Sequence, residues 1–148
     1  MANSPSALIE SLRDRPAWPE GWFRYSIALY NARKWNEAEL GFRRLVALNP
    51  VAAAAHHCLG SCLLQQGRWA EAAAHESLAV ALTPMWPQAH RFLGRALYSL
   101  EKWVDAEIAL ATSLSQEPAQ IDSLFYLGLT RLRLGRPEDA ETDRKSVV

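Results

Sequence analysis

Hydrophobic residues recur along the chain at a helical spacing that is interrupted at regular intervals. Leu59, Leu63 and Leu64 have the spacing that places side chains along one face of a helix. Gly67 follows them, and a glycine at that point is a typical helix stop. A second stretch ends at Pro84, because proline cannot continue a helix and starts a turn. The pattern predicts pairs of helices joined by short turns.

The whole pattern repeats with a period of 34 residues. The period is marked by the prolines Pro16, Pro50, Pro84 and Pro118 and by the tryptophans Trp35, Trp69 and Trp103. The segment 33–38 is matched by the segments 67–72, 101–106 and 135–140, and each of them ends in alanine. A small residue at this position lets two helices approach closely. The repeating unit is therefore expected to be an antiparallel helix pair.

This period, with its small and large positions, resembles the tetratricopeptide repeat, a helix–turn–helix unit. The resemblance spans about residues 5–142 and implies an all-α fold, a right-handed superhelical α-solenoid of antiparallel helix pairs. The first helix of each pair is called A and the second B. The implied parts are a B-type capping helix (1–18), three repeats (19–52, 53–86 and 87–120), a truncated fourth repeat (121–142) and a tail (143–148). The chain departs from the family pattern at His56, His90, Glu76 and Arg131.

The fourth repeat stops soon after its B helix begins, so Leu124 and Leu127 are expected to lack a packing partner. An uncovered apolar face is an aggregation liability in repeat arrays, and it makes self-association through this end one expectation. The residues Asp143–Val148 correspond to the translation of the start of a common sequencing-library adapter. We therefore expect the natural sequence to depart after Thr142 and the chain to be the N-terminal part of a longer protein.

The charge balance excludes two classes of partner. Sixteen Lys and Arg residues balance sixteen Asp and Glu residues, so the formal net charge is zero at pH 7. Such a chain has no general attraction for nucleic acid or for an anionic membrane, and neither partner is expected. Residues 1–20 lack the basic and apolar segments of a signal peptide, and two cysteines do not make a disulfide framework. A cytoplasmic protein is the expectation.

No catalytic, cofactor or metal site is predicted from the residue pattern. Cys58 and Cys62 lie four residues apart, but a zinc site needs four converging ligands and a buried free cysteine is ordinarily a small hydrophobic side chain. His56 and His90 share a packing position of the repeat and are interpreted as polar aromatic residues rather than bases. The spacing supplies neither a nucleophile with its base nor a glycine-rich phosphate loop. The chain is therefore not expected to be an enzyme.

The resemblance implies a peptide groove, because certain positions of the A helices usually face the concave surface in this family. Arg91 and Arg95 lie one helical turn apart beside Tyr98, and guanidinium groups next to aromatic rings suit a carboxylate-bearing peptide. The alternative interpretation of the two arginines is a solvated helix face. The predicted peptide-binding residues are Phe23, Ile27, Tyr30, Asn31, His57, Ser61, Gln65, Gln88, Arg91, Arg95, Tyr98, Phe125 and Arg133.

The function implied by the resemblance is a protein–protein interaction scaffold that binds a peptide or a partner helix without catalysis of its own. Related repeats hold chaperone tails with a set of Lys, Asn and Arg residues. At those positions, counted from the first repeat, this chain has Phe23, Ile27, Cys58, Gln88 and Phe92, so a chaperone tail is not an expected partner. The alternative is the non-catalytic N-terminal arm of a larger enzyme, such as a glycosyltransferase, sulfotransferase or methyltransferase.

Overall fold

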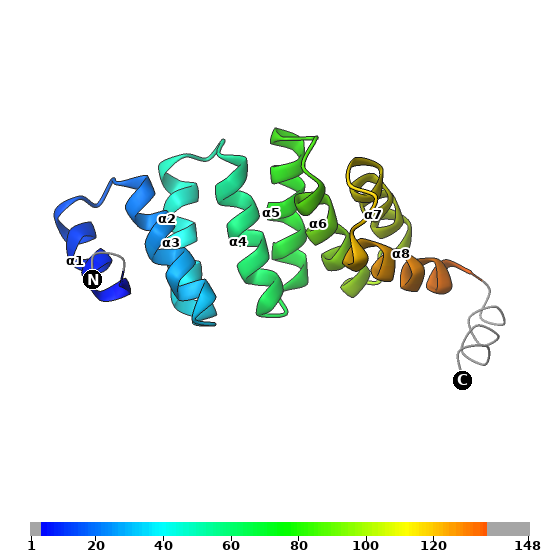
Figure 1. The fold of residues 1–148 in the computed structure, drawn as a ribbon, viewed down its shortest axis with the longest axis horizontal. Helices are drawn as coiled ribbons and strands as arrows, with labels where there is room; N and C mark the ends of the chain where they lie inside the picture. Colours follow the sequence, from blue (N-terminus) through cyan, green and yellow to red (C-terminus); the bar gives the residue numbers. More distant parts are fainter. Residues whose placement is uncertain (1–3, 136–148) are drawn as a thin grey trace. The chain divides into compact units, whose positions relative to one another are not determined.

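A computed structural model describes residues 4–135, which form α-helices and no β-strand. The chain separates into two compact units, Met1–Thr83 and Pro84–Val148. The all-α prediction is confirmed over the described residues, whereas the end of the truncated repeat and the adapter-like tail lie outside them. The first unit holds α1 (Pro5–Asp14), α2 (Pro19–Asn31), α3 (Trp35–Leu48), α4 (Ala53–Gln65) and α5 (Trp69–Leu82), and the second holds α6 (Pro87–Ser99), α7 (Trp103–Gln116) and α8 (Ile121–Leu134) (Figure 1).

Six of the eight described helices begin with proline or tryptophan. Proline is the first residue of α1, α2 and α6, where its missing N–H would have no partner in any helix. In α1 the Ser4 Oγ also accepts the backbone N–H of Ala7 at 3.3 Å, as an N-cap. Tryptophan is the first residue of α3, α5 and α7. The helix starts therefore follow the period of the sequence.

The turn from an A helix to its B helix has one backbone conformation in three places. Arg33, Gly67 and Glu101 occupy the same position of the repeat, and each has a positive φ, at 59°, 73° and 61°. The amide of the next residue closes the helix end by donating to a carbonyl five residues earlier, as in a Schellman motif. These bonds run from Lys34 to Leu29, from Arg68 to Leu63 and from Lys102 to Leu97, at 2.9, 3.0 and 2.9 Å. The turn geometry therefore recurs even where the residue is not glycine.

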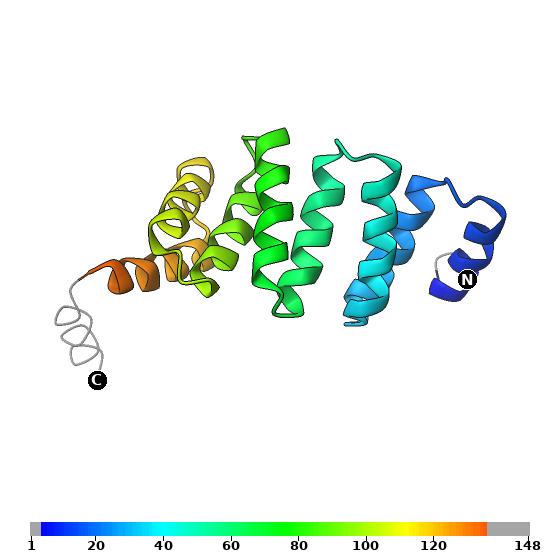
Figure 2. The ribbon, with the colours of Figure 1, turned by 180° about the vertical axis from the view of Figure 1, so that it is seen from behind.

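In the first unit each helix packs on the next along the chain, from α1 to α5. Figure 1 and Figure 2 both show α4 and α5 side by side. The apolar core between these helices includes Leu8, Phe42, Leu59 and Leu63, which are all at most 3% exposed. A thiol also joins α4 to α3, because Cys62 donates to the carbonyl of Trp35 at 3.1 Å. Cys62 therefore packs in the core of the first unit as a small side chain.

A charged network joins α3 to α5. Arg43 contacts both Glu39 and Glu71, with N–O distances of 2.7 and 3.1 Å. Arg68, just before α5, also contacts both carboxylates, at 2.7 Å each. Burial raises the pKa of Glu39, but hydrogen bonds from Gln66, Arg43 and Arg68 outweigh burial, so its pKa is lowered. The Glu39 carboxylate is therefore stabilised in its charged form.

In the second unit α7 packs on both α6 and α8, and α6 also contacts α8. Ser113 of α7 donates to the carbonyl of Pro87 at 2.9 Å and contacts the Ser123 hydroxyl of α8 at 3.0 Å. The expectation that Leu124 and Leu127 both lack a partner is only half correct. Leu124 is 53% exposed, but Leu127 is 7% exposed because α8 packs on α6 and α7.

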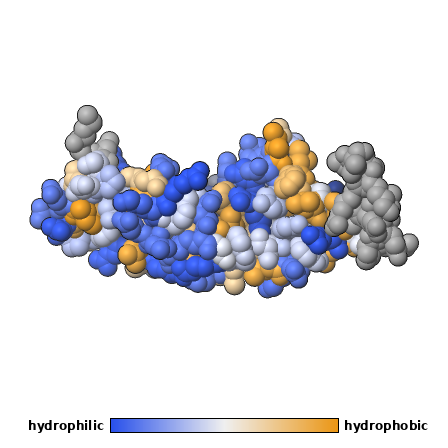
Figure 3. Space-filling model, turned by 90° about the horizontal axis from the view of Figure 1, so that it is seen from below, coloured by the Kyte–Doolittle hydropathy of each residue, from blue (hydrophilic) through white to orange (hydrophobic). Residues whose placement is uncertain are grey.

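Hydrophobic side chains gather on the surface of the second unit near its last described residues, as Figure 3 shows. Those that remain exposed on α7 and α8 are Val104, Ile108, Ile121, Leu124, Phe125 and Leu134. Among the described helices, none combines the length and the apolar character that a membrane crossing requires. Four of the exposed hydrophobic residues belong to α8, namely Ile121, Leu124, Phe125 and Leu134.

Glycine allows the A and B helices to approach closely at two equivalent positions. A Cβ added to Gly94 of α6 would lie 2.5 Å from Cγ of Leu110 on α7. A Cβ added to Gly60 of α4 would lie 2.7 Å from Oε1 of Glu76 on α5. At Gly128 of α8, by contrast, an added Cβ would meet nothing within 4 Å among the described residues. Packing therefore requires Gly94 and Gly60, whereas no contact within residues 4–135 requires a glycine at position 128.

We expect Gly94→Ala and Gly128→Ala to change stability in opposite directions. The new methyl group at residue 94 overlaps Leu110 and should cost about 1–3 kcal/mol. The same change at residue 128 meets open space and should stabilise the helix by about 0.5–1 kcal/mol, because alanine loses less backbone entropy than glycine. Urea denaturation of both variants measures the difference. Equal effects at the two sites would contradict the packing described for α6 and α7.

Candidate functional site

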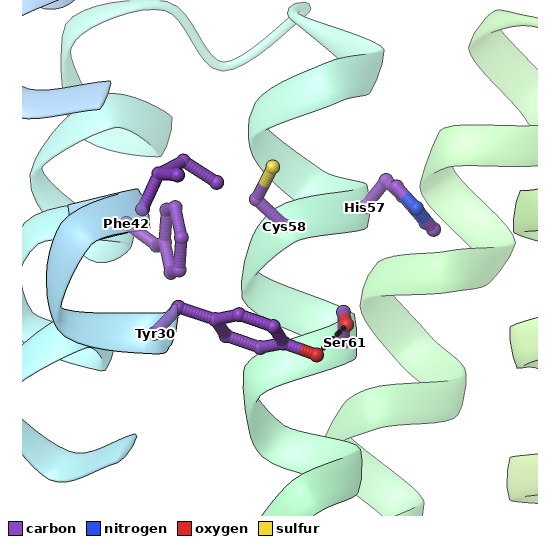
Figure 4. A pocket seen from close by; sticks show the side chains of 6 residues that line it. Tyr30, Phe42, His57, Cys58 and Ser61 are labelled. Atoms are coloured by element: carbon purple, nitrogen blue, oxygen red, sulfur yellow. Dashed lines mark hydrogen bonds between the residues drawn. The ribbon is translucent and has the colours of Figure 1, made fainter. Parts of the chain in front are cut away.

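A cavity of about 160 Å³ opens in the first unit between α2 and α4, with α3 behind it. Its lining residues are Ile27, Tyr30, Phe42, His57, Cys58 and Ser61. Of these, Ile27, Tyr30, His57 and Ser61 belong to the predicted peptide-binding set. In Figure 4, Phe42, Cys58 and Tyr30 lie to one side of α4, and the His57 ring points away from them at the edge of the cavity. The structure therefore brings four predicted residues from two A helices together.

Polar groups at the edge of this cavity form a short hydrogen-bonded chain. The Tyr30 hydroxyl and the Ser61 Oγ lie 2.8 Å apart, shown by the dashed line in Figure 4. The Gln65 amide donates to the Tyr30 hydroxyl at 3.5 Å. If Tyr30 then donates to Ser61, the Ser61 hydroxyl hydrogen remains for an acceptor in the cavity. Asn31, the next predicted residue, is exposed at the end of α2.

Phe23 lies apart from this cavity and lines a second hollow. It is 42% exposed. The hollow has a volume of about 320 Å³ and is lined by Pro19, Glu20, Phe23, Leu45, Ala52, Ala54 and Ala55. Its signal in the sequence is the run of alanines at the start of α4, which leaves room beside a large aromatic residue. The first unit therefore has two hollows beside α2. The sequence predicted some of the residues that line them but not the hollows themselves.

His57 also contacts a buried carboxylate on α5. Its Nδ1 lies 2.9 Å from Oε2 of Glu76, whose side chain is 0% exposed. The other carboxylate oxygen, Oε1, has no hydrogen-bond partner among the described residues. Burial raises the pKa of Glu76 to about 7, although the hydrogen bond from His57 acts in the opposite direction. The sequence marked Glu76 only as a departure from an aromatic position and did not indicate this pair.

The other two histidines of the first unit contact each other, and its two cysteines are protonated thiols. His56 is 4% exposed, and its Nε2 donates to the carbonyl of Pro50 at 2.7 Å. Its Nδ1 lies 3.1 Å from Nδ1 of His75, and the two rings are stacked. Burial raises the pKa of both Cys58 and Cys62 to about 11, so both are neutral thiols. Within residues 4–135, no group of three or more His, Cys, Asp or Glu side chains is arranged to hold a metal ion.

In the second unit the predicted arginines lie among aromatic rings. The Arg95 guanidinium lies 5.5 Å from the ring centre of Phe92 and 5.3 Å from that of Tyr126. Tyr98 contacts Tyr126 edge-on, with ring centres 5.5 Å apart. Arg91 also lies over Phe92, at 5.3 Å. The structure therefore brings Arg91, Arg95 and Tyr98 together, and it adds Tyr126 and Phe92 to them.

The two arginines differ in their charge partners. Arg91 lies 3.8 Å from the Asp122 carboxylate. No carboxylate of the described residues lies within ion-pair distance of Arg95. The Nε atoms of both arginines are buried without a hydrogen-bond partner in this part of the chain. Arg95 is therefore the residue of this cluster whose charge is least compensated.

The other predicted residues of the second unit lie near this cluster or beside it. Phe125 is 60% exposed and contacts Tyr126 edge-on, with ring centres 5.4 Å apart. Arg133 lies 5.8 Å from the ring centre of Trp103. Gln88, near the start of α6, is partly exposed. These residues extend the exposed aromatic and basic surface but form no cavity that the structure describes.

The family model of the tetratricopeptide repeat matches residues 23–85 and 93–143. The chain belongs to the tetratricopeptide repeat family. The resemblance inferred from the 34-residue period is thereby confirmed. No curated protein matches the chain.

Solved tetratricopeptide repeat structures resemble the chain closely in fold. A crystal structure of MamA protein is 22% identical, with a TM-score of 0.85 over 95% of this chain and 77% of that chain. MamA 41-end from Desulfovibrio magneticus RS-1 is 24% identical, with a TM-score of 0.84 over 95% and 78%. The first repeat domain of Spaghetti (RPAP3), bound to the HSP90 peptide SRMEEVD, is 20% identical, with a TM-score of 0.76 over 78% and 92%. These likenesses confirm an all-α helical-repeat solenoid.

A spacing of 31 residues relates three predicted residues to their partners on the next A helix, two of which the predicted set lacks. Tyr30 contacts Ser61, Arg91 contacts Asp122, and Arg95 contacts Tyr126. In each pair the second residue lies 31 positions after the first, which is one repeat of 34 less three positions. Residues related in this way lie on adjacent A helices of a tetratricopeptide array. Tyr126 would have been included in the predicted site by this rule.

Proposed function

We propose that this chain is a protein–protein interaction module that binds a peptide or partner helix along its A helices and has no catalysis of its own. The cavity between α2 and α4 is the observation that supports this proposal most directly. Apolar side chains of Ile27, Phe42 and Cys58 line it, and the hydroxyl pair of Tyr30 and Ser61 closes one edge. A binding site of this kind combines apolar walls with a few polar groups that orient the ligand.

The size of the cavity fits one anchoring side chain of a partner. An apolar cavity of about 150 Å³ holds a benzene-sized molecule, and this cavity measures about 160 Å³. We therefore propose that a leucine, methionine or phenylalanine of the partner enters it. Such buried anchors contribute a large share of the binding energy at protein interfaces.

Arg95 is the proposed receptor for a carboxylate of the partner. Its guanidinium lies over the rings of Phe92 and Tyr126, which partly replace its contact with water. Arg91 is less suited, because Asp122 already lies 3.8 Å from it. The RPAP3 domains that resemble this chain are bound to peptides, which supports a peptide partner in general.

The proposal is tested with peptides selected from a random library by panning against the folded chain. Fluorescence anisotropy then measures their affinity for Ile27→Trp, which fills the cavity, and for Arg95→Glu, which reverses the receptor charge. We expect each change to weaken binding at least about tenfold, which corresponds to about 1.4 kcal/mol. The combined Arg91→Glu and Arg95→Glu variant should abolish binding of acidic peptides.

The matched control is Arg13→Glu on α1, an exposed arginine that belongs neither to the cavity lining nor to the cluster around Arg95. It should leave the affinity of every selected peptide within about twofold of the unmodified chain. Circular dichroism of each variant checks that helicity is unchanged. Peptides that bind all variants equally well would place the binding surface elsewhere.

A further inference from the structure

Glu76 is the residue whose burial the fold itself does not explain. The equivalent positions of α3 and α7 are taken by Phe42 and Leu110, both 0% exposed. Glu76 is buried to the same extent, with Oε1 lacking a hydrogen-bond partner among the described residues and lying against Gly60. Burying a carboxylate that is only partly hydrogen-bonded is costly. Residues that break the packing rule of their own repeat are expected at functional positions.

The hydrogen bond from His57 connects this carboxylate to the proposed binding cavity. His57 Nδ1 lies 2.9 Å from Glu76 Oε2, and His57 is also one of the residues that line the cavity. Its side chain is 16% exposed, whereas that of Glu76 is 0% exposed, so His57 is the member of the pair that reaches solvent. A change of charge on the pair therefore changes the electrostatic potential at the cavity edge.

The other titratable groups near the pair keep one protonation state or face away from it. Cys58 on α4 lines the same cavity, but burial raises its pKa to about 11, so it remains a neutral thiol between pH 6 and pH 8. On α5 the neighbouring His75 faces His56 of α4 and feels the charges of Arg43 and Glu71, and burial lowers its pKa. Within the pair, Glu76 is the group that exchanges a proton in this range, because burial raises its pKa to about 7.

We propose that the His57–Glu76 pair makes ligand binding in the cavity proton-linked, so that a ligand presenting a carboxylate binds more tightly as the pH falls from 8 to 6. This inference rests on the proposed function. Proton uptake removes the negative charge behind the cavity, which otherwise repels an anionic group. The Ser61 hydroxyl, at the end of the hydrogen-bonded chain from Gln65 through Tyr30, supplies a donor for such a group. Because the coupling is reciprocal, ligand binding also draws a proton to the pair.

The test uses benzoate as the anionic probe and benzyl alcohol as a neutral probe of similar size. The δ-methyl signal of Ile27, which lines the cavity, reports binding through the ring current, and the exposed Ile108 serves as an internal reference. Titrations at pH 6 and pH 8 compare the unmodified chain with Glu76→Gln, which holds the position neutral. Glu39→Gln is the matched control, because Glu39 is also buried but outside the cavity.

We expect benzoate to bind roughly three- to tenfold more tightly at pH 6 than at pH 8, since one linked proton changes affinity at most about tenfold per pH unit. Benzyl alcohol should change less than about twofold, because it carries no charge to be repelled. Glu76→Gln should bind benzoate at pH 8 as the unmodified chain does at pH 6, whereas Glu39→Gln should keep the original pH dependence.

Two outcomes would overturn the inference in distinguishable ways. The same benzoate pH dependence in Glu76→Gln as in the unmodified chain would remove the pair as its cause and leave the cavity as a binding site. A folded chain whose Ile27 signal responds to neither probe at either pH would show that the cavity is no binding site. That second result would overturn the proposed use of the cavity together with its proton linkage.

Discussion

Ala72→Trp is expected to destabilise the first unit strongly. Ala72 is 0% exposed on α5, which packs against α4. Ala38 and Ala106, at the same position of the other B helices, are also 0% exposed, so no space exists for a larger side chain. Overfilling a packed core costs about 1–3 kcal/mol, and an indole in place of a methyl group lies at or beyond the upper end of that range. Thermal and urea denaturation followed by circular dichroism measure the loss.

Ala70→Trp is the matched control for this prediction. Ala70 lies two residues earlier on the same helix and is exposed, so the new indole meets solvent. Its stability should stay within about 0.5 kcal/mol of the unmodified chain. If Ala72→Trp were as stable as Ala70→Trp, the face of α5 that packs on α4 would be wrongly assigned. The phase of the repeat would then be wrong as well.

The period predicted the helix pairs because packing imposes the same small positions in each repeat. The first repeat shows where this reasoning by single positions is insufficient. Ser26 stands where the other repeats have Gly60, Gly94 and Gly128. The facing helix compensates with Gly41, since an added Cβ there would collide with the Ser26 hydroxyl. In the first repeat the glycine therefore lies on the B helix instead of the A helix, and the two helices still approach closely. That Ser26 and Gly41 face each other is seen only in the structure.

The candidate site was predictable in its positions but not in its contacts. The A-helix positions placed Ile27, Tyr30, His57 and Ser61 on one surface, and the cavity contains all four. The direction of each side chain depends on local packing. His57 turns toward α5 because a buried carboxylate replaces the usual apolar residue there. Arg95 lies over Tyr126 rather than extending into solvent. The direction of each of these side chains depends on a second residue, whereas a periodic pattern describes one position at a time.

Glu76→Gln is expected to make the stability of the chain less dependent on pH. Glu76 in the unfolded chain ionises near its ordinary pKa of 4.5, whereas burial raises its pKa in the folded chain to about 7. Between these values the folded state holds a proton that the unfolded state has released. The free energy of unfolding of the unmodified chain therefore falls as the pH rises through this range. Glutamine does not ionise, so the free energy of unfolding of Glu76→Gln does not fall for this reason.

The size of the effect follows from the difference between the two pKa values. From 4.5 to about 7 it corresponds to about 3 kcal/mol at most. Relative to the unmodified chain, Glu76→Gln should therefore gain stability by up to about 3 kcal/mol between pH 4.5 and pH 8. Other groups contribute similarly to both proteins and largely cancel in this comparison. Urea denaturation at intervals across this range measures the difference.

Glu39→Gln should show the opposite sign and so separates this effect from a general response to acid. Glu39 accepts hydrogen bonds from Gln66, Arg43 and Arg68, which lower its pKa despite its burial. Its carboxylate therefore stabilises the fold above pH 4.5, and the stabilisation is lost as the pH falls through the folded value. Removing this charge should destabilise the chain at pH 7 and matter less in acid. Parallel stability curves for Glu76→Gln and the unmodified chain would contradict the prediction, because Glu76 would then ionise as it does in water despite its burial.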